Sequence, residues 1–400
     1  MNRHFTLLAM VFFLWGMITS INSAIILFFS QYFAVSWQQA ILVTVIFYVV
    51  PFAVCLPCAR LMARWGYRRV LQGALLLSAT GALILAQAVV KSTFFGALFG
   101  MFVIASGVSM LQVVANPYLT ALSTPARQVG NLSLASAVNS LGTTLAPAGI
   151  ALLFRLSPEQ QPISGLFSAL AVVTLALMAG TMLLKLPDVR INHIRTPSVS
   201  GLWQVKEIRL TILAIFLYVG AEVSLATNLP PYLIATGAWS ADTALSLLSF
   251  YWGGALVGRL LFGFIAHPSR HAAIFRTAAL SGFILLLLAV VMNNAAGGIA
   301  LLMVGLANSV IYPMIFGHAL SRWPSLASLL AGTMVMAGIG GAALPWAHAW
   351  LVEATSLRLS FLLPMSLYLL LMLWGEYVMK REKLTLSTPG KGECETTGKV

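Results

Sequence analysis

Charge is scarce in this sequence of 400 residues: only 8% are Asp, Glu, Lys or Arg, whereas 60% are hydrophobic. A soluble domain has roughly 25% charged residues, most of them on its surface. The scarcity excludes a soluble enzyme, a nucleic-acid-binding protein and a disordered chain. The apolar runs are continuous, unlike the period-two alternation of a transmembrane β-barrel, so we predict a helical membrane protein.

Several catalytic and metal-binding patterns are also missing. The three cysteines, Cys55, Cys58 and Cys394, form no disulfide framework, and we interpret the first two as small buried residues beside a proline. No Walker A sequence, nucleophile elbow or metalloprotease motif occurs. We therefore expect no enzyme activity, no cofactor and no metal site. The net charge of +13 lies in short clusters between apolar runs, so we expect no nucleic-acid partner.

Apolar stretches long enough to cross a bilayer occur twelve times. The predicted fold class is an all-α integral membrane protein with twelve transmembrane helices. We place these helices at 5–30, 39–62, 70–90, 93–120, 130–154, 162–185, 208–234, 242–266, 272–292, 296–319, 326–350 and 357–379.

The basic residues predict the orientation of these helices. All of the 23 Lys and Arg residues except Lys91, Arg155 and Arg358 fall in the loops and tails of one side. The positive-inside rule assigns that side, with both termini, to the cytoplasm. Arg259 is counted among these inner-loop residues.

A long hydrophilic stretch near the middle of the chain divides it into two parts. We predict an N-terminal six-helix half (1–186), a cytoplasmic linker (187–207), a C-terminal six-helix half (208–379) and a disordered cytoplasmic tail (380–400). Basic turns after the second and eighth helices, at 59–69 and 258–270, indicate an internal repeat. Transporters built from such repeats bind substrate near the bilayer midplane, between the repeats.

One acidic residue lies well inside an apolar span. The chain has ten Asp and Glu residues, none before Glu159, and only Glu222 is far from a span end. A charge at the bilayer centre costs about 2.5–3.5 kcal/mol on insertion scales, which something must offset. We interpret Glu222 as a proton carrier or substrate ligand lining a central cavity; the alternative is a structural carboxyl bonded to a neighbouring helix.

Uncharged polar residues repeat at helical spacing on several spans, where they serve either a ligand or helix–helix packing. These stripes are Trp15, Thr19, Asn22 and Ser23; Ser109, Gln112 and Asn116; Ser136, Asn139 and Thr143; and Asn308 and Tyr312. Amides and hydroxyls suit a neutral polyhydroxylated solute, and Trp15, Tyr218 or Trp252 could lie against the apolar face of a sugar. An anion site would need Arg or Lys in mid-span, and we expect none there.

Two further features are interpreted as structural. His318 and His348 lie toward span ends, and we expect helix-end histidines rather than proton carriers. Gly338, Gly340 and Gly341 predict a bend or a close helix contact in the eleventh span.

Five stretches carry a resemblance to a known family. They are Phe-Phe-Leu-Trp-Gly (12–16), Gln-Val-Val-Ala-Asn-Pro-Tyr (112–118), Asn-Ser-Leu-Gly-Thr-Thr-Leu-Ala-Pro (139–147), Tyr-Val-Gly-Ala-Glu-Val-Ser (218–224) and Asn-Ser-Val-Ile-Tyr-Pro-Met-Ile-Phe (308–316). With the twelve spans, they resemble the major facilitator superfamily and, within it, the fucose/galactose/glucose:proton symporters.

The resemblance implies import of a hexose or deoxyhexose, driven by protons, through alternating access. It also implies an Asp after Asn22 and, in fucose permeases, a Glu in the fourth span, whereas this chain has Ser23 and Gln112 there. Asn139 matches the family's amide. Glu222 is then the remaining midplane carboxyl, so either coupling has moved to it, or transport is uncoupled, or the solute is not a simple hexose.

We thus expect a multi-pass sugar transporter of a bacterial inner membrane, monomeric, whose partners are a neutral sugar, protons and lipid. The expected site comprises Trp15, Asn22, Gln112, Asn116, Asn139, Tyr218, Asn308 and Tyr312, with Glu222 as the proton-coupling residue. The alternatives are an uncoupled sugar facilitator, an efflux transporter for amphipathic compounds, and a membrane sensor that transports nothing.

Overall fold

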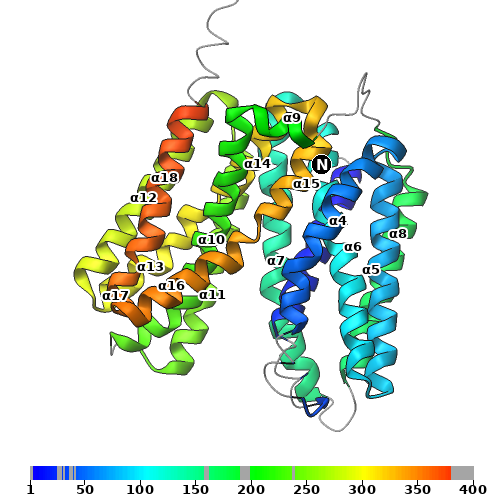
Figure 1. Cartoon of the computed structure of the whole chain (residues 1–400), viewed down its shortest axis with the longest axis horizontal. Coiled ribbons are helices and arrows are strands. Elements are labelled where there is room, and N and C mark those ends of the chain that lie inside the picture. Colours follow the sequence, from blue (N-terminus) through cyan, green and yellow to red (C-terminus); the bar gives the residue numbers. More distant parts are fainter. Residues whose placement is uncertain are drawn as a thin grey trace, which may run out of the picture.

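The computed structural model of the chain describes residues 3–24, 29, 32–35, 39, 42–156, 162–189, 199–236 and 239–379. These residues form helices in two groups that stand side by side (Figure 1). The predicted tail, 380–400, and Cys394 lie outside the described residues, as does the part of the linker at 190–198.

The first group of helices comprises the N-terminal part of the chain. Its members are α1 (Arg3–Ala24), α4 (Leu42–Trp65), α5 (Tyr67–Val90), α6 (Phe94–Ala121), α7 (Gln128–Leu156) and α8 (Pro162–Leu183). A short 3-10 helix, η1 (Pro125–Arg127), leads into α7.

The second group begins after the short helix α9 (Val199–Gln204). Its members are α10 (Lys206–Ala235), α11 (Ala241–Ile265), α12 (His271–Met292), α13 (Ala295–Asn308), α14 (Ile311–Arg322), α15 (Ala327–Ala337), α16 (Gly340–Ala354), α17 (Leu357–Ser360) and α18 (Leu362–Trp374), which continues as the π-helix η4 (Gly375–Met379). Three-residue 3-10 helices precede α12 and α15, η2 (Pro268–Arg270) and η3 (Pro324–Leu326).

Eleven of the twelve predicted spans coincide with described helical segments that are long and apolar enough to cross a membrane. The twelfth, predicted at 130–154, coincides with α7, which is 29 residues long. Asn, Ser and Thr recur along it. Those residues are Asn131, Ser133, Ser136, Asn139, Ser140, Thr143 and Thr144.

Two predicted spans are broken helices. The tenth is α13 followed by α14, and the eleventh is α15 followed by α16, with a turn at Gly338 and Ile339. The glycines of the eleventh span provide both features expected of them: the bend lies at Gly338, and a Cβ on Gly340 would collide with the carbonyl oxygen of Phe216 on α10.

The break between α13 and α14 is explained by a proline, Pro313. Pro313 has no N–H, so the carbonyl of Ser309, four residues earlier, receives no helical hydrogen bond from it. The chain turns at Ser309 and Val310, between the two helices. An unpaired carbonyl at membrane depth needs another donor, which the neighbouring helix α11 supplies.

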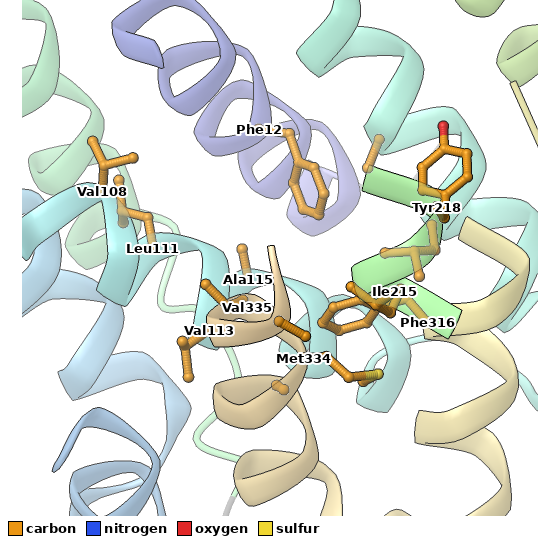
Figure 2. Close-up of a cluster of buried hydrophobic side chains, with 14 of the residues drawn as sticks. Phe12, Val108, Leu111, Val113, Ala115, Ile215, Tyr218, Phe316, Met334 and Val335 are labelled. Atoms are coloured by element: carbon orange, nitrogen blue, oxygen red, sulfur yellow. The ribbon is translucent and has the colours of Figure 1, made fainter. Parts of the chain in front are cut away.

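The two groups of helices share a packed apolar region. Figure 2 shows Phe12 and Leu111 from the first group in one cluster of buried side chains with Ile215, Phe316 and Met334 from the second. All five side chains are fully buried. The two groups therefore share one buried apolar cluster.

Hydrogen bonds that join the two groups gather at η1 and α7. Arg127 Nη1 donates to the Phe264 carbonyl at 3.4 Å, and Ser321 donates to Gln128 at 2.5 Å. Ser133 Oγ and Ser140 Oγ both bond Arg259, described below. A Cβ on Gly130 would lie 3.0 Å from the Gly263 carbonyl oxygen, so glycine allows α7 and α11 to approach closely at this point.

Candidate functional site

A cavity of about 310 Å³ lies between the two groups of helices. It is lined from the first group by α1, α4, α6 and α7, and from the second by α10, α11, α14, α15 and the turn after α15. The polar and aromatic residues in its wall are Trp15, Thr19, Phe47, Tyr48, Ser109, Gln112, Ser136, Asn139, Ser140, Thr143, Thr144, Glu222, Trp252, Arg259 and Tyr312. Pockets of this size and mixed character hold small organic ligands.

Glu222 projects into this cavity from α10. Its Oε1 accepts hydrogen bonds from Tyr218 Oη at 2.7 Å and from Arg259 Nη2 at 3.2 Å, and the side chain is 13% exposed. Within the described part of the chain, Oε2 accepts no hydrogen bond. The carboxylate is thus held by one oxygen and can reach a ligand with the other.

Arg259 is the cation of this site and lies on α11, buried inside the predicted eighth span. Its Nη2 pairs with Glu222, its Nε donates to the Ser309 carbonyl at 3.3 Å, and its Nη1 donates to Ser140 Oγ. The side chain is 10% exposed. The ion pair offsets the cost of each charge at membrane depth, and removing one partner of such a pair costs about 3–5 kcal/mol.

This placement corrects two expectations drawn from the sequence. Arg259 is not an inner-loop residue, and mid-span does contain a basic side chain. Arg259 precedes the end of the predicted span at 266 by seven residues, or about 10 Å of helix. This distance from the span end is the feature of the sequence that distinguishes Arg259 from the basic residues of the loops. The remaining Lys and Arg residues still lie mostly on one side of the predicted membrane, so the predicted orientation is unchanged.

A buried polar network lies behind Glu222 and fixes its position. Asn308 Nδ2 donates to Tyr251 Oη at 2.6 Å, and Tyr251 Oη donates to the Glu222 carbonyl at 3.1 Å. Tyr368 donates to Asn308 Oδ1, while Tyr218 Oη also reaches the Asn308 carbonyl at 3.1 Å. These four residues around Glu222 are fully buried, so the network orients α10 without facing the cavity.

The wall from the first group of helices is polar but carries no charge. Gln112 faces the cavity. Asn139 also lines it, although its Nδ2 donates to the Phe12 carbonyl at 2.8 Å and so joins α7 to α1. The aromatic rings of Trp15 and Trp252 belong to opposite groups, and both line the cavity.

The structure therefore separates the predicted site residues by position. Trp15, Gln112, Asn139, Glu222 and Tyr312 line the cavity together. Three others are fully buried and absent from its wall: Asn116, Tyr218 and Asn308. The side chains of Asn22 and Ser23 lie outside the described part of the structure.

Three other residues singled out in the sequence are absent from the cavity wall. His348 is fully buried rather than at a helix end, with Nδ1 3.2 Å from Asn228 Nδ2 and Nε2 2.8 Å from Ser360 Oγ. Cys55 and Cys58 are buried and free, as expected.

Comparison with known proteins identifies the class. The sequence profile of the Major Facilitator Superfamily matches residues 7–336, so the chain belongs to that superfamily, and the predicted fold is confirmed. A glucose/galactose transporter of Brucella abortus is 33% identical, over 92% of each chain. The L-fucose-proton symporter of Escherichia coli is 26% identical, over 84% of each chain. These relatives confirm the narrower resemblance, and a transporter family confirms that the chain is not an enzyme.

Solved structures agree on the fold. The transporter FucP in the outward conformation superposes with a TM-score of 0.82 at 23% identity, covering 94% of this chain and 98% of FucP. A proton:xylose symporter, XylE, superposes with a TM-score of 0.71 at 14% identity, covering 94% of this chain and 95% of XylE.

The network behind Glu222 generates a prediction about stability. Asn308→Ala removes the acceptor of the Tyr368 hydroxyl and one of the two hydrogen bonds of the Tyr251 hydroxyl in a dry region. We expect a loss of about 2–4 kcal/mol in the free energy of unfolding, measured by denaturation in detergent. Asn131→Ala is the control, because Asn131 is partly exposed and bonds Ser123 at 2.9 Å, near a helix end. Equal losses in the two variants would contradict the network's structural role.

Proposed function

We propose that the chain is a secondary active transporter that imports a neutral sugar together with a proton across a bacterial inner membrane. The relatives named for glucose, galactose and fucose support this sugar class. The observation that carries the proposal is the cavity itself. One wall offers uncharged amides and hydroxyls, both walls offer aromatic rings, and a single carboxyl, Glu222, faces the space between them.

The chemistry of the wall matches that of a sugar. Gln112 provides both a donor and an acceptor, as alternating ring hydroxyls require. Trp15 and Trp252 offer flat apolar surfaces for the C–H face of a pyranose. The lining charges of Glu222 and Arg259 cancel, so the site favours a neutral solute over an anion or a cation. A site for the efflux of amphipathic compounds would need only aromatic and apolar side chains, so that alternative does not explain the polar wall.

Glu222 is proposed as the proton site. Of the described carboxyls, it is the one that lines the cavity, and protonation turns it from an acceptor into a donor toward a sugar hydroxyl. Binding of a proton and binding of a sugar then involve the same side chain. Asn308 and Tyr218 are proposed as positioning residues that hold α10, since both are buried behind the cavity.

Alternating access follows from the way the halves meet. We propose that the halves are 1–186 and 208–379, joined by a cytoplasmic linker at 187–207, and that the protein works as a monomer with both termini in the cytoplasm. Hydrogen bonds between the halves lie near the basic turns that contain Arg127 and Arg270. If that side is cytoplasmic, the described state is closed on the inside, in keeping with the outward conformation of FucP.

The first test concerns coupling. In Glu222→Gln, we expect accumulation of labelled sugar against its gradient to be lost, while exchange of labelled for unlabelled sugar is retained, because the amide still hydrogen-bonds but carries no proton. Glu353→Gln is the control, since Glu353 is exposed at the end of α16. Unchanged accumulation in Glu222→Gln would remove this carboxyl from the mechanism.

The second test concerns recognition. Gln112→Ala removes an uncharged donor and acceptor from the wall, so we expect the half-saturating sugar concentration to rise about tenfold with the ratio of protons to sugar unchanged. Exposed Gln87→Ala on α5 serves as the matched control. An affinity equal to that of the unmodified protein would place the sugar elsewhere. Uptake of amphipathic drugs without competition by any sugar would favour the efflux alternative.

A further inference from the structure

We propose that Asn116 is a further sugar-binding residue, which the solute meets as it passes from the cavity that contains Glu222, called the central cavity below, into a second chamber on the inner side. The proposal rests on the proposed function, because it concerns how the imported sugar is released. Two stacked cavities and a buried amide oxygen between them support it.

A second cavity, of about 440 Å³, lies at the level of the basic turn that contains Arg127. We call this cavity the inner chamber. Its polar side chains are those of His4, Ser123, Arg127 and Asn131. Arg127 is exposed, whereas Leu8 and Leu119, which also line the chamber, are buried. The inner chamber therefore extends from the surface into the protein.

The inner chamber and the central cavity are stacked along four helices, α1, α6, α7 and α11, which line both. On α1, Trp15 lines the central cavity and Leu8 lines the chamber. On α6, the corresponding residues are Gln112 and Leu119. Each pair is seven residues apart, which is about two turns or 10 Å of helix. Two turns return a side chain to the same face, so the two cavities lie on one line through the protein.

A thin layer of side chains separates the two cavities. Phe12 lies between Leu8 and Trp15 on α1, and Asn116 lies halfway between the lining residues of α6. By helical spacing both belong to the face that lines the cavities, yet both are fully buried and neither is in the described wall of either cavity. The Phe12 ring also contacts the Trp15 ring, with 5.1 Å between their centroids. These two side chains thus close the route from one cavity to the other.

Asn116 has an unused acceptor in this layer. Its Nδ2 donates to the Gln112 carbonyl at 2.7 Å, which fixes the orientation of the amide. Within the described part of the chain, its Oδ1 accepts no hydrogen bond although the residue is fully buried. Such acceptors are rare, because leaving one unpaired costs free energy. A sugar hydroxyl that crosses the layer can donate to Oδ1, which replaces one of the hydrogen bonds to water that the sugar loses there.

The protein can open on both sides of the inner chamber. Pro117 follows Asn116 inside α6 and has no N–H, so the Val113 carbonyl receives no helical hydrogen bond from it, and the helix can bend there. At the surface, Arg127 Nη1 donates to the Phe264 carbonyl of the other group of helices, and both residues line the chamber. Bending at Pro117 would open the layer, and loss of the Arg127 contact would open the chamber to the inner surface.

Replacement of Asn116 by leucine tests its role. Asn116→Leu keeps the number of side-chain heavy atoms but has no acceptor. We expect its melting temperature in detergent to be equal or higher, because no buried polar atom is left unpaired. Binding of labelled glucose, galactose or fucose, whichever the unmodified protein exchanges, should stay within about twofold, since the central cavity is intact. The maximal rate of uptake by cells should fall about tenfold, because the sugar loses a hydrogen bond at the layer.

Two further variants accompany this test. Asn116→Ala removes the same oxygen without added bulk, so it should also lower the maximal rate and leave binding unchanged. Ser106→Ala is the matched control and should keep the full rate, since Ser106 is buried on α6, donates to the Phe102 carbonyl at 2.8 Å and is in neither described wall. A lower melting temperature of Asn116→Leu with an unchanged maximal rate would show a purely structural amide and would overturn the inference.

Labelling of the inner chamber tests the route separately. In a chain that carries Cys394→Ser, the remaining Cys55 and Cys58 are buried, and Ser123→Cys places a thiol in the chamber wall. In inside-out vesicles, the exchanged sugar should slow labelling of this thiol by an impermeant maleimide about threefold, because the sugar occupies the chamber. Ser321→Cys is the control, since Ser321 is exposed on the same side but is not in the described chamber wall. Its labelling should not slow.

Two labelling results would overturn the inference. Equal slowing in Ser123→Cys and Ser321→Cys would show closure of the inner side instead of sugar in the chamber. No slowing in Ser123→Cys would show that the sugar does not bind there. Absence of exchange of glucose, galactose and fucose by the unmodified protein would instead overturn the proposed function.

Discussion

The ion pair between Glu222 and Arg259 is the constraint on which the rest of the site depends. Two charges at membrane depth are tolerated because each offsets the other, and because neutral groups complete their hydrogen bonds. Tyr218 supplies one of these groups. The carbonyl of Ser309 supplies another, since Pro313 leaves that carbonyl without a helical donor. The break between α13 and α14 and the buried tyrosine network thus serve the same pair.

The two halves have different chemistry around the shared cavity. The first half offers neutral polar side chains, such as Gln112 on α6 and Asn139 on α7. The second half holds the charged pair on α10 and α11. Neutral polar groups and the charged pair therefore lie on opposite walls, and Arg259 joins the two walls because its Nη1 donates to Ser140 Oγ.

Most of the fold could be predicted from the sequence because long apolar runs indicate membrane-spanning helices directly. The charges of the loops likewise predict the orientation, and the single mid-span carboxyl, Glu222, indicates the site. It could not predict the helix break at Ser309, since the apolar run through 296–319 is continuous and proline alone does not always break a membrane helix. Arg259 was missed because a cation close to the inner turn is more often a loop residue, so only its depth along the span distinguished it.

The polar stripes illustrate a second limit. Helical spacing places Gln112 and Asn116 on one face of α6, yet Gln112 lines the cavity whereas Asn116 is fully buried. Likewise Tyr312 faces the cavity and Asn308, one turn earlier, faces Tyr251 and Tyr368. Periodicity gives the face of a helix, but which part of that face meets another helix depends on packing that no local pattern encodes.

The most direct test of proton coupling through Glu222 is proton movement into liposomes that contain the unmodified protein when a sugar gradient is applied without a pH gradient. We predict that one sugar of the hexose and deoxyhexose panel drives protons inward as it enters, acidifying the interior at a fixed ratio of protons to sugar. Entry of that sugar with no acidification would show an uncoupled carrier and would contradict the coupling role of Glu222.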